Sequence, residues 1–544
     1  MNPTNPILPA AGPAPRTIFD LLAAAAAEWP SRTAALFFGA RLTYAALLDN
    51  ALALSHSLDG FFGIGRGSKV ALMLPDCPQT VMALFALGRL GAVCVMINPT
   101  SPGPEIDYLL QDSEAEAMIL LDQFLPQADA APAFRRLRSI IVTAVAEYLP
   151  FHLAALHRFR QGRSVLPAHA RHFSDLLKGG RAGASAAVAN GDDLALIQYT
   201  GGTTGRPKGV MLTHANLLAN VEQIGEWVGG GARRGGEILL AVLPYFHVFG
   251  LTCSLLFPVA MAATMVMLPR FDVTEVTKAV ERYHATMLPA IPAMFSVLVR
   301  DPHAARHDFS SLKLCISGAS ALTDEAARLF ATRTGVEITQ GYGLTEASPV
   351  THVNRATGAR KAGSIGVPLP RTRCRIMDLE SGERELPRGE IGELVVAGPQ
   401  VMAGYWKLPE ETARTLRGEW LHTGDVARVD AEGYYYIVDR KKEMIITAGY
   451  NVYPSEVEAA VMDLAGVREV AVVGLPDDLR GEQVAAFLVV EEGAGLTEPA
   501  VREHCRGRLA AYKVPRVVRF RKELPKSLIG KVLKREIKRQ EEGG

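Results

Sequence analysis

The chain has 544 residues, too many for one hydrophobic core, and this length predicts a multidomain globular protein of roughly three or four structural units. Its 58 Lys and Arg almost balance its 57 Asp and Glu, so no global field steers nucleic acid, and we expect no nucleic-acid partner. The 6 cysteines form no CxxC pair, which favours reduced thiols and argues against a zinc site.

Residues 1–16 are rich in proline and lack the basic and apolar regions of a signal peptide. We therefore expect a disordered lead and a cytoplasmic protein. From residue 17, strand-like runs at 69–75, 91–99 and 312–318 alternate with helical segments, which predicts an α/β domain whose parallel sheets are flanked by helices.

The uncharged run 251–268 is long enough to raise the question of a membrane span. Pro258 interrupts this run, and a buried helix followed by a buried strand would have the same hydropathy. We expect the second arrangement.

The segment 145–185 has a different character. Basic residues outnumber acidic ones in it and are interleaved with Phe, Leu and His; they are Arg158, Arg160, Arg163, Arg171, Lys178 and Arg181. Such a pattern suits a basic amphipathic surface for lipid head groups, which would give peripheral contact with the inner face of the membrane. An ordinary solvated helical insertion explains the pattern equally well.

Short strands separated by Gly-rich turns begin near residue 361 and predict a small β subdomain over 361–441. From residue 442 to 544 the pattern is helix, strand, strand, helix and a basic tail, which predicts a compact α+β unit.

The loop "YTGGTTGRPKGV" at 199–210 is a candidate phosphate site. Its glycines permit close backbone approach, its threonines offer hydroxyls, and Lys208 offers a point charge. A P-loop is excluded because Pro207 precedes this lysine and Gly209 follows it. A Gly- and Thr-rich surface turn is the plain alternative.

A second motif, "QGYGLTEASPV" at 340–350, places Tyr342 between two glycines, so that a flat base could lie against its ring. Glu346 supplies the hard oxygen ligand that Mg²⁺ prefers. The alternative is a helix N-terminus in which Thr345 is the cap and the glutamate lies in the first turn.

Three weaker motifs follow. "LHTGDVA" at 421–427 places Asp425 after a strand, where its carboxylate could accept hydrogen bonds from ribose hydroxyls. "VDRKKEMIITAGYN" at 438–451 offers Arg440, two lysines and a glycine turn, and "LPKSLIGKVLKREI" at 524–537 carries Lys531 on a basic segment.

Together and in this order, these motifs resemble the adenylate-forming family of acyl-CoA synthetases, adenylation domains and luciferases. The resemblance covers about 17–538, with Gly201 standing where many members have serine. It implies an N-terminal domain at 17–441, with two helix-flanked sheets and the β subdomain, and a small mobile domain at 442–544 that swings on a hinge at Lys442. It also implies ATP and CoA as co-substrates and Mg²⁺ as the cofactor.

The resemblance further implies roles for individual residues. Thr200 and Glu346 help to hold Mg²⁺, Tyr342 stacks on adenine, and Lys531 bridges the carboxylate and the α-phosphate. The implied ATP contacts are Thr200, Gly201, Gly202, Thr203, Thr204, Gly205, Lys208, Ser317, Gly318, Ala319, Gly341, Tyr342, Gly343, Thr345, Glu346, Asp425, Arg440 and Lys531. Asp425 and Arg440 would contact the ribose, and Gly449 with Tyr450 would line the CoA tunnel.

The implied reaction attaches AMP to a carboxylate, expels pyrophosphate and then passes the acyl group to a thiol. The implied catalytic residues are Lys531, Glu346, Thr200 and His247. The apolar segments 242–251 and 287–299 match the walls of the acyl pocket, to which His247, Val248, Phe249 and Pro292 belong, although a structural histidine is the plain alternative. The absence of a charged group in these walls favours an apolar acid.

The motif spellings look most like bacterial long-chain fatty-acyl-CoA ligases, so we expect a fatty acid, ATP and CoA as partners. Medium-chain or aryl acids and a carrier-protein thiol as acceptor remain alternatives. A non-enzymatic lipid-binding protein would not need Glu346, Asp425 and Lys531 together, and a P-loop ATPase is disfavoured by the failed signature. The sequence leaves open whether the chain forms a homodimer.

Overall fold

The computed structural model describes residues 16–149, 167, 170–179, 189–200, 206–320, 322–355, 360–526 and 532–542. The expected lead lies almost wholly outside these residues, as does much of the basic segment 145–185. The chain divides into two compact units, residues 1–373 with 397–421 and residues 374–396 with 422–544.

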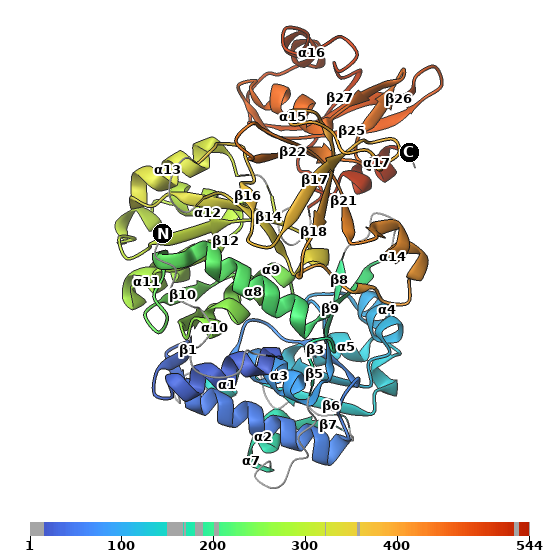
Figure 1. Cartoon of the computed structure of the whole chain (residues 1–544). Coiled ribbons are helices and arrows are strands. Elements are labelled where there is room, and N and C mark those ends of the chain that lie inside the picture. Colours follow the sequence, from blue (N-terminus) through green and yellow to red (C-terminus); the bar gives the residue numbers. More distant parts are fainter. Residues whose placement is uncertain are drawn as a thin grey trace. The chain divides into compact units, whose positions relative to one another are not determined.

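The first unit contains an eight-stranded sheet whose central strands are parallel (Figure 1). In spatial order the strands are β19 (Gly404–Tyr405), β9 (Lys208–Thr213), β8 (Leu194–Thr200), β4 (Val93–Met96), β3 (Lys69–Met73), β5 (Ala117–Leu121), β6 (Ser139–Thr143) and β7 (Ala170–His172). β9 runs antiparallel to both β8 and β19. The predicted strands near 69–75 and 91–99 are therefore neighbours in one parallel sheet.

A nine-stranded sheet forms the other half of this unit. Its order is β16 (Val367–Pro368), β15 (Val350–Val353), β14 (Ile338–Gly343), β13 (Leu314–Ser317), β12 (Met287–Ala290), β10 (Ile238–Ala241), β11 (Thr264–Met267), β1 (Thr33–Phe37) and β2 (Ala40–Thr43). The strands from β14 to β1 pair in parallel, and the strands at either edge are antiparallel.

Helices cover these sheets and begin and end where the sequence signals them. The main helices are α1 (Ile18–Glu28), α2 (Tyr44–Phe62), α3 (Pro78–Leu90), α4 (Gly103–Ser113), α5 (Leu125–Asp129), α7 (Phe173–Gly179), α8 (His214–Val228), α11 (Val273–Tyr283), α12 (Pro292–Arg300), α13 (Asp324–Thr334) and α14 (Pro409–Thr415). In α3 a proline occupies the first turn, and Gly91 ends the helix with φ of 66°. The side chain of Thr213 caps α8 by accepting from Asn216 N.

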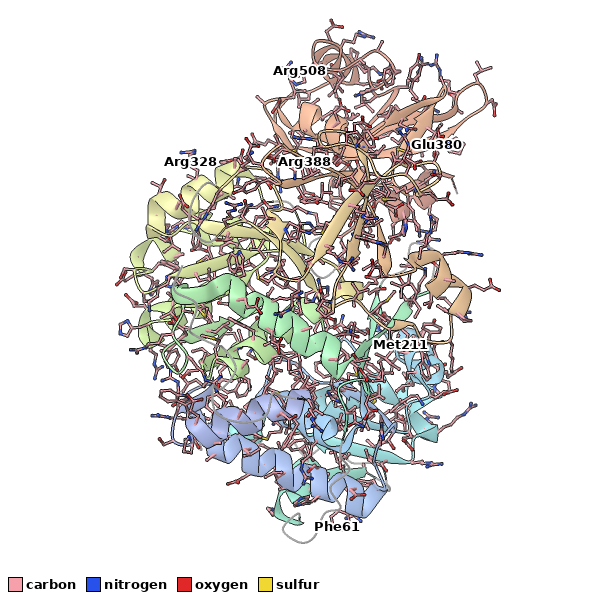
Figure 2. The ribbon with its side chains drawn as sticks, viewed as in Figure 1. Phe61, Met211, Arg328, Glu380, Arg388 and Arg508 are labelled. Carbon is pink, nitrogen blue, oxygen red and sulfur yellow. The ribbon has the colours of Figure 1, made fainter. Side chains whose placement is uncertain are left out.

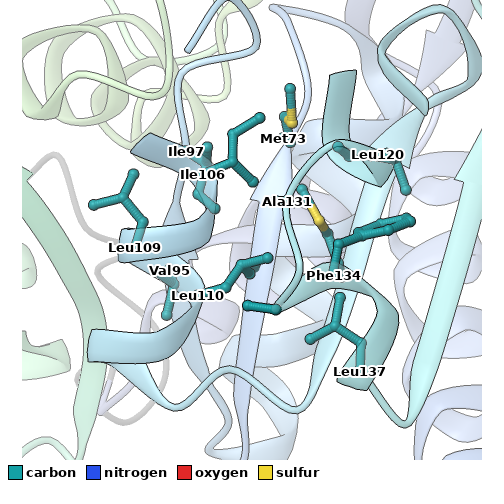
Figure 3. Close-up of a cluster of buried hydrophobic side chains, with 14 of the residues drawn as sticks. Met73, Val95, Ile97, Ile106, Leu109, Leu110, Leu120, Ala131, Phe134 and Leu137 are labelled. Atoms are coloured by element: carbon teal, nitrogen blue, oxygen red, sulfur yellow. The ribbon is translucent and has the colours of Figure 1, made fainter. Parts of the chain in front are cut away.

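The core of the eight-stranded sheet lies beneath α4 and α5 (Figure 3). Strand residues such as Met73, Val95 and Leu120 pack there against Ile106 and Phe134. All five side chains are buried, so this face of the sheet excludes water.

The uncharged run 251–268 is a buried helix followed by a buried strand, as predicted. It comprises the π-helical segment η5 (Leu251–Leu256), α10 (Phe257–Ala260) and β11, which lies parallel to β10 and β1. Within the described ranges, no helix combines the length and apolarity needed to cross a bilayer.

The second unit carries β17 (Arg373–Met377), β18 (Gly392–Ala397), β21 (Trp420–Val429) and β22 (Tyr435–Arg440), apart from the few end residues that belong to the first unit. Its other sheet has the order β24 (Tyr450–Val452), β23 (Ile445–Thr447), β26 (Gly481–Val490) and β25 (Val467–Asp477), with β27 (Val517–Phe520) on β26. The helices are α15 (Pro454–Met462), α16 (Glu498–Arg506) and α17 (Lys534–Glu542). The predicted α/β, small β and α+β organisation is confirmed.

The cysteines form no disulfide: all 6 are free, and all but Cys374 are buried.

Candidate active site

Three neighbouring parallel strands of the nine-stranded sheet, β10, β12 and β13, end at the same edge. The predicted segment 242–251 follows β10 directly, and the predicted segment 287–299 begins on β12 and continues beyond its end. The predicted residues 317–319 lie at the end of β13 and just after it. β14, which carries the "QGYG" motif, pairs with β13 on its other side. Ligands of open α/β sheets bind at such carboxyl ends, so the fold gathers four of the predicted segments at one edge.

Residues 317–319, at the end of β13, are tightly packed. A Cβ atom on Gly318 would lie 3.0 Å from Phe249 Cζ, so a larger residue at that position would push the Phe249 ring aside. Ala319 has a φ of 71°, a left-handed conformation that is strained for a residue with a side chain and that often marks functional sites. The structure thus places a predicted nucleotide-binding residue and a predicted acyl-pocket residue in contact.

The "QGYG" motif forms the end of β14. Tyr342 lies opposite His352 on β15, and their rings make an edge-on contact with centroids 5.8 Å apart. A Cβ atom on Gly343 would collide with the carbonyl of Pro349, so the backbones approach too closely there for any side chain. Thr345 and Glu346 lie in a short 3-10 helix, η7 (Thr345–Ala347), whose N-cap is Leu344. The alternative, a helix N-terminus with Glu346 in its first turn, is therefore present, but Thr345 is not its cap.

The phosphate-loop motif connects two antiparallel strands. Thr200 is the last residue of β8 and lies opposite Lys208, the first residue of β9. The residues between them, 201–205, lie outside the described part of the chain, so their predicted contacts stay predictions.

Tyr405, on β19, joins this loop to the glutamate of the second motif. Its hydroxyl donates to Glu346 Oε1 over 2.8 Å, and Lys208 Nζ lies 5.2 Å from its ring centroid. Lys208 also forms an ion pair with Glu411 on α14. Burial and the Glu346 carboxylate raise the pKa of the Tyr405 phenol, so it remains a donor at neutral pH.

The donor atoms here suit magnesium. Glu346 offers a carboxylate and Thr200 a hydroxyl, both hard oxygen donors, and η7 packs beside β9. Across the described ranges, no three His, Cys, Asp or Glu side chains cluster closely enough to cage a metal. A site of this kind matches Mg²⁺, which commonly takes one or two protein oxygens and completes its shell from phosphate and water.

His247 caps the short helix α9 (Val248–Gly250) by accepting from Phe249 N at Nδ1 over 3.3 Å. Burial lowers the pKa of the imidazole, so it is neutral and carries its proton on Nε2. Val248 is buried, and Pro292, also buried, begins α12 beyond β12. Gln198 on β8 donates to the carbonyl of Phe246 over 2.8 Å and so ties the histidine segment to the eight-stranded sheet.

In the second unit, Asp425 and Arg440 lie opposite each other on β21 and β22. Arg440 Nε is 2.7 Å from Asp425 Oδ1, and the aspartate is 2% exposed. Asp425 therefore lies within a strand, not after one as the sequence suggested, and the predicted pair is brought together by strand register.

The other predicted residues of the second unit lie in turns and short strands. Lys442 is in the turn between β22 and β23, and Gly449 has a φ of 80° in the next turn. Tyr450 is exposed and stacks on Tyr512, with centroids 4.5 Å apart. Lys531 lies outside the described residues.

Sequence reasoning missed Tyr405, Glu411 and Gln198. Each acts through a partner more than 40 residues away, on another strand or helix. No local spacing signals such a pair.

Two segments of the chain match family models. Residues 22–406 match the model of the AMP-binding enzyme, and residues 456–531 match that of the AMP-binding enzyme C-terminal domain.

Full-length relatives agree with these models. A long-chain-fatty-acid–CoA ligase of Bacillus subtilis (strain 168) is 41% identical over 97% of this chain and 95% of its own length. A feruloyl-CoA synthase of Amycolatopsis sp. is 37% identical over 94% of this chain and 96% of its own. Among solved structures, ATP-bound MatB from Rhodopseudomonas palustris superposes with a TM-score of 0.84 at 30% identity, covering 96% of this chain and 98% of that one.

The matched segments and the full-length relatives show that the chain belongs to the AMP-binding enzyme family and is an adenylate-forming acyl-CoA ligase.

Proposed function

We propose that the protein activates a fatty acid, preferably one with a long chain, and that it releases acyl-CoA, AMP and pyrophosphate. The observation that carries the proposal is the arrangement around Tyr405, where the Glu346 carboxylate and the Lys208 ammonium lie at the end of the β8–β9 loop. A negative metal ligand and a positive side chain at one loop suit the binding of a polyphosphate.

The first half-reaction makes a mixed anhydride. A carboxylate oxygen of the acid attacks the α-phosphorus of ATP, the bond to the bridging oxygen breaks, and pyrophosphate leaves with its electron pair. Lys208 neutralises phosphate charge, Thr200 and Glu346 would hold Mg²⁺, and Lys531 orients the two anions that must meet. Magnesium, when bound, adds further charge neutralisation on the phosphate oxygens.

The nucleoside contacts are assigned from the resemblance of the motifs. Tyr342 offers its ring to the adenine, with 317–319 on the other side, and Asp425 accepts hydrogen bonds from the ribose hydroxyls. The packing of 317–319 supports the proposed adenine contact, and the Asp425–Arg440 ion pair supports the proposed ribose contact. Neither role needs a covalent protein nucleophile.

In the second half-reaction the CoA sulfur attacks the acyl carbonyl and AMP leaves. We assign the CoA channel to the turn at Gly449 and Tyr450, and the hinge between the two half-reactions to Lys442. This assignment follows the resemblance of the motifs, with the exposed position of Tyr450 as structural support.

The apolar character of the acyl segments supports a fatty acid. Val248 and Phe249 are buried, and the described parts of 242–251 and 287–299 contain no Asp, Glu, Lys or Arg. The Bacillus subtilis relative bears the name of a long-chain ligase. The feruloyl-CoA synthase relative, at 37% identity, favours an aryl acid as the second candidate.

One experiment separates these functions. A panel of fatty acids from short to long, together with ferulic acid, is assayed for pyrophosphate release with and without CoA. We expect the highest kcat/KM with long chains and sustained turnover only when CoA is present. Higher kcat/KM for the aryl acid would move the assignment to the second candidate, and turnover only with an acyl-carrier protein would identify the carrier as acceptor.

A further inference from the structure

Glu393 is a buried carboxylate in the second unit, on β18, to which the proposed reaction gives no role. It is 4% exposed. A carboxylate is costly to bury unless it is fully paired, so its partners indicate what it holds in place.

The two oxygens of Glu393 bind two different segments. Oε1 accepts from Gly424 N over 3.2 Å, and Oε2 accepts from Lys441 Nζ over 2.9 Å. His422 Nδ1 lies 3.4 Å from Oε2. The two bound segments also meet directly, because Lys441 N donates to the carbonyl of Gly424 over 2.8 Å.

The bound residues flank the candidate ribose-binding pair. Gly424 immediately precedes Asp425, and Lys441 immediately follows Arg440. Gly424 has a φ of 71°, so the chain turns there in a conformation that glycine adopts readily. The Glu393 carboxylate therefore binds the residue next to Asp425 on β21 and the residue next to Arg440 at the end of β22.

The other end of β21 and β22 is held by different hydrogen bonds. Arg388, which precedes β18 and is labelled in Figure 2, donates to the carbonyl of Ala431 over 2.7 Å, and Gly389 N donates to the carbonyl of Val429 over 2.8 Å. These two hydrogen bonds hold that end of the strands without Glu393. The Glu393 carboxylate therefore stabilises only the end that carries Asp425.

The charge state suits this contact. Burial acts to raise the pKa of Glu393, but the contacts with His422 and Lys441 outweigh it and lower the pKa to about 2. The carboxylate is therefore ionised at neutral pH and accepts at both oxygens.

We propose that Glu393 is a positioning residue for nucleotide binding, with Lys441 as its counter-charge: it sets the geometry in which Asp425 and Arg440 meet the ribose. This inference rests on the proposed function, because it takes from it the ribose contact of Asp425. Glu393 itself need not touch the nucleotide.

The test compares Glu393→Gln with the wild-type full-length protein. Glutamine keeps the shape but places an amide N–H₂ or an uncharged oxygen against Lys441. We expect binding of AMP, measured by calorimetry, to weaken by about 10-fold, because Asp425 and Arg440 lose the carboxylate that holds their neighbours in place. The KM for ATP should rise similarly, whereas the KM values for the fatty acid and CoA should stay unchanged.

A ribose-specific readout separates positioning from general support. The variant should lose most of its preference for AMP over 2′,3′-dideoxy-AMP, since only the hydroxyl contact is misplaced. Lys441→Gln should reproduce the loss and Lys441→Arg should restore binding, which keeps the test valid should Glu393→Gln fold poorly. The matched control is Glu385→Gln, which breaks the exposed Arg375–Glu385 ion pair of the same unit and should change nothing.

Two results would overturn the inference, and both can be told apart from failure of the proposed function. The first is a folded Glu393→Gln variant with wild-type AMP affinity and wild-type ribose preference. The second is an equal drop of affinity for AMP and for 2′,3′-dideoxy-AMP. Asp425→Asn tests the function itself: wild-type nucleotide affinity in that variant would contradict the ribose assignment, whatever Glu393 does.

Discussion

At the scale of single residues, the phenol of Tyr405 stands between a carboxylate and an ammonium. It donates to Glu346 on one side and presents its ring to Lys208 on the other. Without the hydroxyl, the carboxylate loses a hydrogen bond that fixes its orientation, and metal ligands are known to depend on such partners.

This contact leads to a graded prediction. Glu346→Gln should lower adenylation by about 100-fold or more at saturating Mg²⁺, because a charged ligand is lost. Tyr405→Phe should instead raise the Mg²⁺ concentration for half-maximal rate by about 10-fold with a smaller effect on the maximum.

The measurement is pyrophosphate release against Mg²⁺ concentration, with circular dichroism to confirm folding. Tyr436→Phe is the control, since Tyr436 also donates to a carboxylate, that of Asp430 over 3.2 Å, and both residues belong to the second unit. An unchanged Mg²⁺ curve in both site variants would contradict the metal assignment.

Lys531 provides a second prediction at this scale. Its charge can bridge the acid and the α-phosphate only in the first half-reaction, so Lys531→Ala should lose acyl-AMP formation by about 100-fold or more yet still convert supplied acyl-AMP and CoA to thioester. Lys526→Ala, which removes another lysine of the same basic segment, one that pairs with Glu469 over 2.6 Å, is the matched control. Loss of both half-reactions in folded Lys531→Ala would give this lysine a different role.

At the scale of elements, the site depends on where strands end. The parallel strands expected near 69–75, 91–99 and 312–318 are present as β3, β4 and β13, because apolar runs bounded by Gly and Pro are local signals. The motifs at 199–210 and 340–350 were recognisable for the same reason.

The side-chain contacts that could not be predicted depend on the register between strands that are distant in the sequence. Tyr405 reaches Glu346 only because β19 pairs with β9, and Asp425 meets Arg440 only because of the β21–β22 register. Glu393 gave no signal at all, since a glutamate in a "GELVV" strand normally suggests a solvent-facing position. Such pairings depend on tertiary structure, which spacing along the chain does not encode.

The turn between β22 and β23 carries the prediction for this scale. Proline fixes φ near roughly −65°, so Lys442→Pro should hold the chain in the conformation that makes acyl-AMP. A single turnover of pyrophosphate release should be spared, while thioester formation slows by about 10-fold or more.

Both half-reactions are measured on the same preparation, with Lys442→Ala as the control that removes the charge and leaves φ free. A proportional drop of the two rates in Lys442→Pro would make Lys442 an ordinary turn residue.

At the scale of the whole molecule, the basic segment 145–185 raises the question of lipid contact. Of its described residues, Arg171 places its guanidinium 5.1 Å from the ring of Phe61, which lies at the end of α2 and is 54% exposed (Figure 2). An exposed aromatic ring beside a basic side chain suits the head-group region of a membrane.

The lipid hypothesis predicts that the protein sediments with anionic liposomes, and that reversing the charges at Arg158, Arg160 and Arg163 abolishes this binding without changing turnover of short acids. Reversal at Arg135, Arg136 and Arg138, another exposed arginine group, is the matched control. Equal sedimentation of the 158–163 variant and the wild type would leave the segment as a solvated insertion.

The burial of the cysteines bears on the chemoselectivity of the enzyme. An acyl adenylate acylates any thiolate that reaches it, and a protein that makes one exposes its own sulfurs to self-acylation. Burial raises the pKa of all six thiols here, that of Cys77 to about 11 and that of Cys253 to about 12. At neutral pH these sulfurs therefore stay protonated and poorly nucleophilic, so that the thiol of CoA meets little competition from the protein's own thiols for the activated acyl group.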